Sequence, residues 1–354
     1  MPSNPLTPDS ILIVRLGAMG DVLHAMPAVG ALRRALPAAH FGWTIERRWA
    51  ELLRSEEGAQ ATTEGRDLVD SIHLVDTHNW RKNIFGTSTT RDIGNAVGSM
   101  RAKKYAIAID IQGASKSALL AKLSCAASIY GFQKPRETLA TILYSTKVNT
   151  RAAHVVDQNL ELCSAMTRAP LTAADFDLPR SPQAEGWCKE ALKSIGKFAI
   201  LNPGSGWGAK CWPAERFAEV ARRLRACGIA SIINYGPGED ELANSVAKLS
   251  DSAAHPMFCT ISQLVALTRR ASLFIGGDTG PLHLAAALKI PVVALFGPTD
   301  PARNGPYGTP SVILRRAVSV TSYSHVAEPD PGLQSITVDE VVRAASQLLG
   351  VAIG

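Results

Sequence analysis

The residues best placed for chemistry lie in three glycine-rich turns, the first of which holds Asp21. Residues 11–15 are apolar and predict a buried strand, Gly17 and Gly20 mark a turn, and Asp21 falls in the first turn of a helix. Ligands of open α/β sheets bind beyond the carboxyl ends of the strands, so Asp21 is well placed for chemistry. The alternative is that Asp21 only caps the helix. A dinucleotide site is disfavoured, because Gly17-x-x-Gly20 is not the G-x-G-x-x-G spacing.

The second turn follows the apolar run 198–202 and holds Ser205, Gly206 and Lys210 before Pro213, a residue suited to the first turn of a helix. Glycines let backbone N–H groups approach an oxyanion, while a hydroxyl and a mobile ammonium group add donors. The turn therefore predicts a phosphate site. A plain surface loop with a solvated lysine is an equally good interpretation of this segment alone. It is not a Walker loop, because no Gly-Lys-Ser/Thr sequence is present.

The third turn follows a strand predicted at 273–276 and delivers Asp278, Thr279 and Gly280 to the start of a helix. The free N–H groups and the positive dipole end of a helix bind anions, so a diphosphate fits this turn. His283 comes four residues after Thr279 and lies on the same helical face, although a single histidine is more often simply packed. The Asp-Thr-Gly triplet of aspartic proteases occurs twice and in all-β proteins, which excludes that class.

Another strand end carries Glu239, which follows the sequence Tyr235-Gly-Pro-Gly and can hold a ribose diol. An exposed glutamate in the first turn of a helix is the alternative. The strand at 292–296 is likewise followed by Gly297-Pro-Thr-Asp-Pro. Successive strand ends with polar, glycine-rich loops are what a nucleotide pocket requires.

Short β-rich runs alternate with helical patterns along the whole chain, which predicts parallel, doubly wound sheets in two Rossmann-like domains. Helices are predicted near Pro213, Glu239, Ser262 and Thr279, and at 154–166 and 338–349. The predicted strands are 11–15, 41–46, 71–76, 105–110, 127–131, 198–202, 230–235, 273–276 and 292–296. The predicted division is a first domain at 1–166, a linker at 167–182, a second domain at 183–336, and a C-terminal helical segment at 337–354 that packs back on the first domain.

The bulk composition fits this plan. A chain of 354 residues with 46% hydrophobic and 19% charged residues should form two globular domains. The formal charge of +6 suits an anionic ligand or membrane surface, whereas the 6% aromatic content and the absence of a nucleic-acid-binding motif argue against nucleic acid. The six cysteines show no metal-ligand spacing, so we expect no metal site and no disulfides.

No apolar run approaches the ~18 residues that span a bilayer. The first ten residues lack the charged and then apolar layout of a secretion signal. We therefore expect a cytoplasmic protein.

Taken together, the chain resembles the ADP-heptose:lipopolysaccharide heptosyltransferases. The motifs that carry the resemblance are Arg15-Leu-Gly-Ala-Met-Gly-Asp-Val-Leu-His and Gly277-Asp-Thr-Gly-Pro-Leu-His. Two further segments, Asp110-Ile-Gln-Gly-Ala-Ser-Lys-Ser-Ala and Lys134-Pro-Arg-Glu, are similar to heptosyltransferase I. The resemblance implies a GT-B fold with two parallel sheets facing a central cleft. It also implies ADP-L-glycero-D-manno-heptose as donor and a Kdo residue of Kdo-lipid A, at the inner membrane, as acceptor.

By this resemblance Asp21 matches the catalytic aspartate and Lys210 the lysine that meets the donor phosphates. Glu239 matches the ribose-binding glutamate, with Glu241 as a second candidate. The other implied donor contacts are Ser205, Gly206, Asp278, Thr279, Gly280 and His283, and the implied acceptor contacts are Arg81, Lys82, Lys116, Arg136 and His154. The chain departs from the family at His78 and Asn79, where arginines are usual, and at Ala18, where a hydroxyl is usual.

The expected reaction is a single displacement with inversion at the anomeric carbon. Asp21 would deprotonate the acceptor hydroxyl, while Lys210 and the backbone at Thr279 and Gly280 would stabilise the departing diphosphate. No cofactor is required, although a divalent cation can stimulate. We expect a monomer that is peripheral on the cytoplasmic face of the inner membrane.

Four alternatives remain at this point. They are heptosyltransferase II or a related transferase with another acceptor, a sugar-nucleotide epimerase, an NAD-dependent oxidoreductase, and a non-enzymatic glycan-binding protein.

Overall fold

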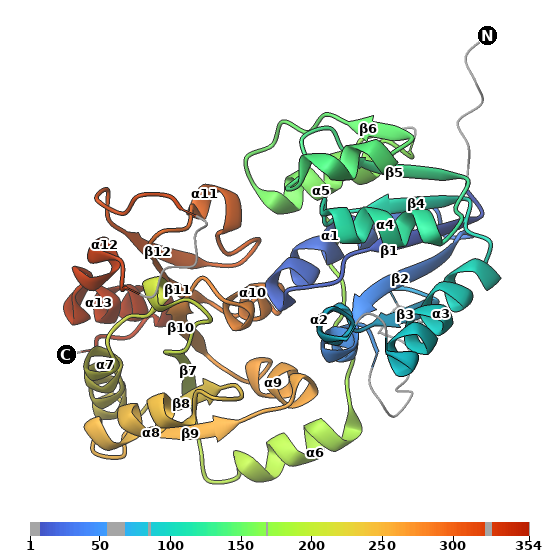
Figure 1. Cartoon of the computed structure of the whole chain (residues 1–354). Coiled ribbons are helices and arrows are strands. Elements are labelled where there is room, and N and C mark those ends of the chain that lie inside the picture. The colour runs from blue at the N-terminus through green and yellow to red at the C-terminus, as the bar shows by residue number, and fades with distance from the viewer. Residues whose placement is uncertain (1–7, 55–67, 84–85, 168, 323–327, 354) are drawn as a thin grey trace. The chain divides into compact units, whose positions relative to one another are not determined.

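The computed structural model describes residues 8–54, 68–83, 86–167, 169–322 and 328–353. The chain forms two compact units, Met1–Pro179 and Arg180–Gly354 (Figure 1). The division falls within the stretch 169–180, which has neither helix nor strand. Residues 1–7, on which the expectation about a secretion signal partly depends, and residue 168 of the predicted linker lie outside the described residues. No described helix is long and apolar enough to cross a membrane.

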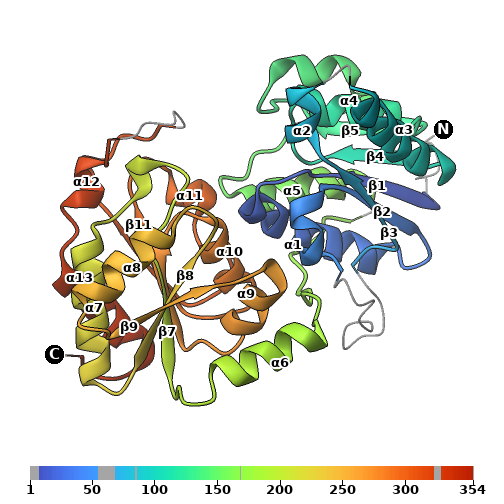
Figure 2. The same cartoon turned by 60° about the horizontal axis from the view of Figure 1, so that its bottom comes forward.

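The first unit is a six-stranded sheet in the order β3-β2-β1-β4-β5-β6, with every pair parallel. Helices α1 and α5 pack together on one face and α3 and α4 on the other (Figure 2). Val14 at the end of β1 lies between Thr44 and Asp110, so the loops after these strands leave one edge of the sheet. The elements are β1 (Ser10–Val14), α1 (Met19–Ala35), β2 (His40–Glu46), η1 (Arg47–Leu52), β3 (Ser71–Val75), α2 (Thr77–Lys82), α3 (Thr87–Ala102), β4 (Ile107–Asp110), α4 (Ser115–Leu123), β5 (Ser128–Phe132), η2 (Thr138–Leu143), β6 (Thr146–Val148) and α5 (Val155–Ser164).

The second unit repeats this architecture in the order β12-β11-β10-β7-β8-β9, again with parallel pairs. Asn202 at the end of β7 lies beside Gly276 of β10, so the loops after these two strands share an edge. The elements are α6 (Pro182–Ala191), β7 (Phe198–Asn202), η3 (Gly208–Lys210), α7 (Ala214–Ala226), β8 (Ala230–Tyr235), α8 (Asp240–Leu249), β9 (Ala254–Phe258), α9 (Ile261–Thr268), β10 (Leu273–Gly277), α10 (Gly280–Ala287), β11 (Val292–Phe296), α11 (Pro301–Asn304), β12 (Ser311–Arg315), α12 (Pro331–Gln334) and α13 (Val338–Leu349).

All nine predicted strands are present to within two residues at either end. Three further strands in the described residues, β6, β9 and β12, were not predicted. Each missed strand lies at the edge of its sheet. Because an edge strand buries only part of its surface, its sequence lacks the continuous apolar run that identifies a central strand. In β9 the run is also interrupted by the exposed His255 and by Pro256.

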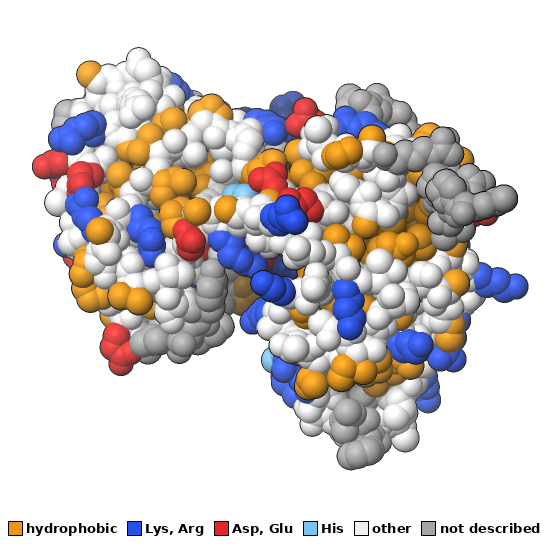
Figure 3. All heavy atoms as spheres, turned by 90° about the horizontal axis from the view of Figure 1, so that it is seen from above, with side chains coloured by type: hydrophobic (Ala, Val, Ile, Leu, Met, Phe, Trp, Pro, Cys, Tyr) orange, Lys and Arg blue, Asp and Glu red, His pale blue; other side chains and the backbone are white. Residues whose placement is uncertain are grey.

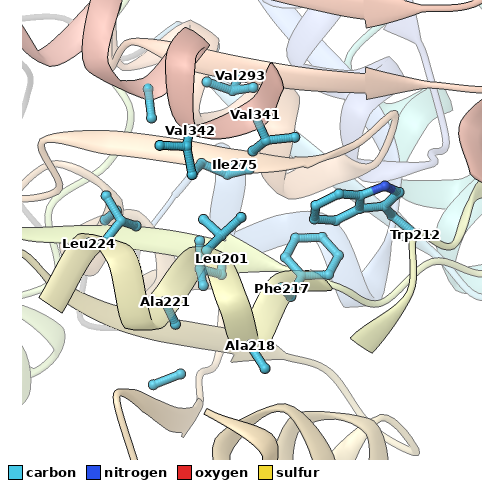
Figure 4. Packing of buried hydrophobic residues seen from close by; sticks show 14 of the residues in the cluster. Leu201, Trp212, Phe217, Ala218, Ala221, Leu224, Ile275, Val293, Val341 and Val342 are labelled. Atoms are coloured by element: carbon cyan, nitrogen blue, oxygen red, sulfur yellow. The ribbon is translucent and has the colours of Figure 1, made fainter. Parts of the chain in front are cut away.

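The C-terminal helix α13 belongs to the second unit, which corrects the expectation that it packs back on the first. Its buried face holds Val341 and Val342, which join Leu201 and Ile275 of the sheet in one hydrophobic core (Figure 4). Glu340 also accepts a hydrogen bond from Arg316 at 2.5 Å. The helix is amphipathic, and its apolar face packs against α7 and strands β10, β11 and β12 of its own unit.

The first unit contains a buried histidine that should make its stability depend on pH. His73 of β3 is 3% exposed and its ring nitrogens lie 2.8 Å from Ser99 Oγ and from Tyr105 Oη. Burial, aided by the positive charge of Lys103, lowers the pKa of His73 to about 4. Gly42 makes room for this cluster, since a Cβ there would lie 1.9 Å from the Tyr105 hydroxyl oxygen.

Because the pKa of His73 is lower in the folded chain than the ordinary value of 6.5, the unfolded chain binds its proton first as pH falls. The free energy of unfolding of the first unit should therefore drop from about pH 6.5 downward, by roughly 3 kcal/mol at about pH 4. Denaturant titrations at several pH values measure this drop, and His73→Gln should reduce it. The exposed His255 provides the control variant His255→Gln, and an equal effect of both variants would contradict the prediction.

Candidate functional site

The carboxylate of Asp21 is held at the start of α1, directly after β1. Its Oδ2 forms an ion pair with Arg15 Nη2 at 2.6 Å and accepts a hydrogen bond from the Ala18 amide at 3.2 Å. The second contact is the capping role that the sequence left as an alternative. The side chain of Asp21 nevertheless remains 40% exposed. The structure therefore combines a cap with a fixed carboxylate that a ligand can reach.

Arg15 is a site residue that the sequence patterns do not predict. Its side chain is 10% exposed, and while Nη2 binds Asp21, Nη1 donates to the Ile111 carbonyl at 3.2 Å. The neighbouring Gly17 is packed so closely that a Cβ would lie 2.6 Å from Trp49 Nε1. In the sequence, Arg15 is simply the last residue of a predicted strand. The only signal for a functional role is that it begins the motif Arg15-Leu-Gly-Ala-Met-Gly-Asp-Val-Leu-His.

The loop after β4 is fixed by the fully buried carboxylate of Asp110. It accepts hydrogen bonds from Tyr144 Oη at 2.7 Å, from Ser117 Oγ at 2.9 Å and from the amides of Gln112 and Gly113. Burial raises the pKa of Asp110, and these donors oppose that rise. The motif that begins at Asp110 is thus a rigid loop, and it leads directly into α4 and Lys116.

Lys116 lies in a polar cluster at the carboxyl ends of β2 and β3. Its Nζ donates to Thr77 Oγ1 at 3.3 Å, and Thr77 in turn donates to the buried Glu46 carboxylate. Partial burial lowers the pKa of Lys116, and the positive charges of Arg81 and Arg48 act in the same direction against Glu46. Two of the predicted acceptor contacts, Lys116 and Arg81, are therefore electrostatic neighbours.

Arg136 is exposed in the turn after β5, next to the Asp110 loop. The amide of Glu137 donates to the Gly113 carbonyl at 2.9 Å, and Glu137 Oε2 accepts from the Ser115 amide at 2.9 Å. Lys82 is the exposed last residue of α2.

His154 caps the N-terminus of α5, with Nδ1 accepting a hydrogen bond from the Val156 amide at 3.2 Å. Its ring meets the ring of His24 edge to face, with centroids 5.7 Å apart. His24 follows Asp21 by one helical turn on α1, so His154 is connected to the helix that carries the carboxylate. The basic positions of the first unit thus lie in loops and helix ends around the carboxyl ends of the sheet.

In the second unit the second and third glycine-rich turns meet through an ion pair. Lys210 Nζ lies 2.7 Å from Asp278 Oδ2 and 3.2 Å from the Asp278 carbonyl oxygen, and 4.4 Å from the centre of the Trp207 ring. His283 Nε2 lies 3.0 Å from Asp278 Oδ1. All three members of this Lys210–Asp278–His283 cluster have side chains that are 13% exposed or less.

Burial alone would raise the pKa of Asp278, but the hydrogen bond and charge of His283 and the charge of Lys210 lower it far below its usual range. The carboxylate is therefore ionised and committed to its two partners. Besides the donor contact predicted for it, Asp278 thus contacts and orients Lys210 and His283. An ammonium group has three donors, and Asp278 takes two of those of Lys210.

Glu239 lies against the start of the second glycine-rich turn. Its Oε2 accepts from the Gly236 amide at 2.8 Å, and a Cβ on Gly204 would lie 2.3 Å from Glu239 Oε1. Glu241 is exposed on α8, so Glu239 is the better candidate for a ligand contact at this edge. Beneath it, Asn234 Nδ2 donates to Asn202 Oδ1 at 3.1 Å, and Asn202 Nδ2 donates to the Gly204 carbonyl at 2.8 Å. This buried amide pair is not predicted by the sequence patterns.

The remaining predicted donor contacts border this cluster. Ser205 Oγ accepts from the Trp207 amide at 3.3 Å, which leaves its proton to donate, and Gly206 is exposed. Thr279 is the N-cap of α10, without a side-chain cap, and Gly280 is the first helical residue. Thr279 and Gly280 are half-buried, so the N-terminus of α10 is open to an anion.

Among the described residues, no group of three or more His, Cys, Asp or Glu side chains is arranged to hold a metal ion. The described cysteines are all free thiols.

Residues 95–327 match glycosyltransferase family 9, described as heptosyltransferase. The chain is 28% identical over 311 residues to lipopolysaccharide heptosyltransferase 1 of Pseudomonas aeruginosa, covering 86% of this chain and 83% of that protein. It is 25% identical over 356 residues to lipopolysaccharide heptosyltransferase 3 of Escherichia coli, covering 93% of this chain and 95% of that one.

Among solved structures, the E. coli heptosyltransferase WaaC with ADP matches with a TM-score of 0.75 at 25% identity, covering 96% of this chain and 99% of that chain. The predicted fold, an α/β GT-B fold with two parallel sheets, is confirmed by this match together with the sheet order of each unit.

Proposed function

This chain belongs to glycosyltransferase family 9, the heptosyltransferases, and from this premise we propose that it transfers L-glycero-D-manno-heptose from ADP-heptose to a Kdo residue of Kdo-lipid A. The reaction inverts the anomeric centre and contributes to the inner core of lipopolysaccharide. The observation that carries this proposal is the 28% identity to lipopolysaccharide heptosyltransferase 1 over most of both chains.

The second unit is the donor-binding unit in this proposal. A diphosphate is anionic, and Lys210 with the open N-terminus of α10 offers an ammonium group and backbone N–H groups to it. Glu239 accepts the ribose hydroxyls, and Ser205 donates to a phosphate oxygen. Asp278 neutralises part of the charge of Lys210 and holds its ammonium group in place beside the donor.

The first unit carries the base. Asp21 accepts the proton of the Kdo hydroxyl as that oxygen attacks the anomeric carbon, and Arg15 keeps the carboxylate oriented. The bond from the anomeric carbon to the diphosphate breaks with its electron pair on the leaving ADP. Lys210 and the α10 amides stabilise this developing charge, and the proposed reaction requires no metal or other cofactor.

The acceptor carries a Kdo carboxylate and lipid A phosphates, and we propose that Lys116, Arg81, Lys82, Arg136 and His154 bind these anions. The basic cluster around Lys116 supports this assignment, since a cation with a lowered pKa gains from an anionic partner. The protein then acts as a monomer, peripheral on the cytoplasmic face of the inner membrane.

The test is ADP release from ADP-heptose with two defined acceptors, Kdo-lipid A and heptosyl-Kdo-lipid A. We expect release and a heptosylated product with Kdo-lipid A only. Product formed only from the heptosylated acceptor would show that the chain catalyses a later step. Conversion of the donor with no acceptor present would favour an epimerase, and saturable acceptor binding without ADP release would favour a glycan-binding protein.

A further inference from the structure

Helices α4 and η2 of the first unit expose large apolar side chains that the hydrophobic core does not use. Leu119 of α4 is 51% exposed, and Leu139 and Ile142 of η2 are 68% and 76% exposed. A single exposed leucine is ordinary, whereas neighbouring exposed apolar side chains mark an interaction surface. We call the exposed faces of these two helices the α4–η2 surface.

The geometry of the two helices places these side chains on outward faces. In η2 the three-residue spacing of Leu139 and Ile142 puts them directly above one another, because side chains three apart eclipse in a 3₁₀ helix. Ala140 between them is fully buried. In α4 the exposed Leu119 alternates with the buried Ala118 and Leu120. The two helices pack against each other, so the exposed residues lie on neighbouring elements.

This surface lies in a basic segment of the first unit. Residues 111–151 contain six basic residues and one acidic residue. The single acid, Glu137, has its carboxylate engaged by the Ser115 amide. The basic residues are all exposed: Lys116, Lys122, Lys134, Arg136, Lys147 and Arg151. Figure 3 shows that hydrophobic side chains and lysine and arginine side chains both occur on the surface of the molecule.

We propose that the α4–η2 surface docks on an anionic lipid bilayer. Leu119, Leu139 and Ile142 enter the boundary between headgroups and acyl chains, while the surrounding Lys and Arg side chains contact lipid phosphates. The inference rests on the proposed function in one respect, since an enzyme with a lipid-anchored acceptor must meet that acceptor at a membrane.

Charge and side-chain type favour an anionic bilayer over a second copy of the chain, another protein or single-stranded nucleic acid as the partner of this surface. A second copy of the chain would bring two strongly basic segments together, which like-charge repulsion opposes. The core of a protein interface is depleted in lysine, whereas lysine flanks the apolar side chains here on α4 itself. Single-stranded nucleic acid requires exposed aromatic rings for stacking, and the described exposed apolar side chains of this surface are aliphatic.

The test is sedimentation of the full-length chain with vesicles of phosphatidylcholine containing phosphatidylglycerol, compared with vesicles of phosphatidylcholine alone. We expect binding to the anionic vesicles, weakened by added salt because the lipid contacts are partly ionic. The double variant Leu139→Asp with Ile142→Asp should bind at least ~10-fold more weakly, because it removes the apolar contacts and adds repulsion. Lys122→Glu should also weaken binding.

The second unit offers a matched control. Val318 and Val320 are 65% and 76% exposed, so the double variant Val318→Asp with Val320→Asp makes the same chemical change at similar exposure. This control should bind as the wild type does. Equal binding by the Leu139/Ile142 variant and the wild type, or equal loss in the control, would overturn the proposal. So would self-association of the wild type that the Leu139/Ile142 variant lacks, since the surface would then join two copies.

A water-soluble Kdo acceptor without acyl chains separates this inference from the proposed function. The Leu139/Ile142 variant should transfer to that acceptor at the wild-type rate. Normal transfer by a wild type that does not bind vesicles would reject the docking surface alone. Vesicle binding by a wild type that transfers no heptose would reject the proposed function alone.

Discussion

Asp21→Asn is expected to lower kcat by at least ~100-fold, the size of effect that follows loss of a general base. The variant keeps the shape of the side chain and can still accept hydrogen bonds from Arg15 and from the Ala18 amide. The helix cap therefore survives, and the loss falls on proton transfer. The affinity for ADP, measured by calorimetry, should be unchanged because the proposed donor contacts all lie in the second unit. Asp9→Asn, an exposed aspartate just before β1, is the control and should turn over normally.

Variants of Arg15 extend this experiment. As a positioning residue it orients the carboxylate without touching the substrate, so Arg15→Met should lower kcat by less than Asp21→Asn does. Arg15→Lys should recover part of the loss, because an ammonium group can still pair with Asp21 although it cannot also reach Ile111 in the same fork geometry. A near-normal kcat in Asp21→Asn would remove Asp21 from the role of base, whatever the Arg15 variants do.

Much of the fold was predictable because central parallel strands are continuous apolar runs followed by glycine-rich turns. β7, β8 and β11 begin and end at the predicted residues for this reason. The edge strand β12 was missed because its side chains are only partly buried. The place of α13 was also misjudged, since an amphipathic pattern shows that a helix packs on something but does not show which sheet it packs on.

The candidate site, like the fold, could be predicted from the sequence only in part. Local spacing identified Asp21, Lys210 and Asp278 as residues at strand ends. It could not reveal that Lys210 and Asp278 form an ion pair, because 68 residues separate them and only the pairing of β7 with β10 brings their loops together. The same holds for Arg15 and Ile111, which meet because β1 pairs with β4. Each of these partners comes from sheet order, which single-sequence patterns do not encode.

Lys210→Ala is expected to lower kcat/KM by about 10²- to 10³-fold, the range for removing one donor that stabilises transition-state charge. It should also weaken ADP binding, which calorimetry measures. Lys248→Ala, an exposed lysine of α8, is the control and should change neither quantity. The difficulty is that Lys210→Ala also leaves the buried Asp278 carboxylate with one partner fewer, so lost activity has two explanations.

The double variant Lys210→Ala with Asp278→Asn distinguishes these two explanations, loss of a cation at the diphosphate and loss of the partner of Asp278. If Lys210 serves only to neutralise Asp278, removing the carboxylate charge should restore both the free energy of unfolding and the activity. If Lys210 acts on the diphosphate, the double variant should regain stability in denaturant titrations while kcat/KM stays low, because no cation then faces the leaving group. Recovery of activity in the double variant would reject Lys210 as a catalytic residue. Low activity with restored stability would assign Lys210 to the departing diphosphate and Asp278 to holding it there.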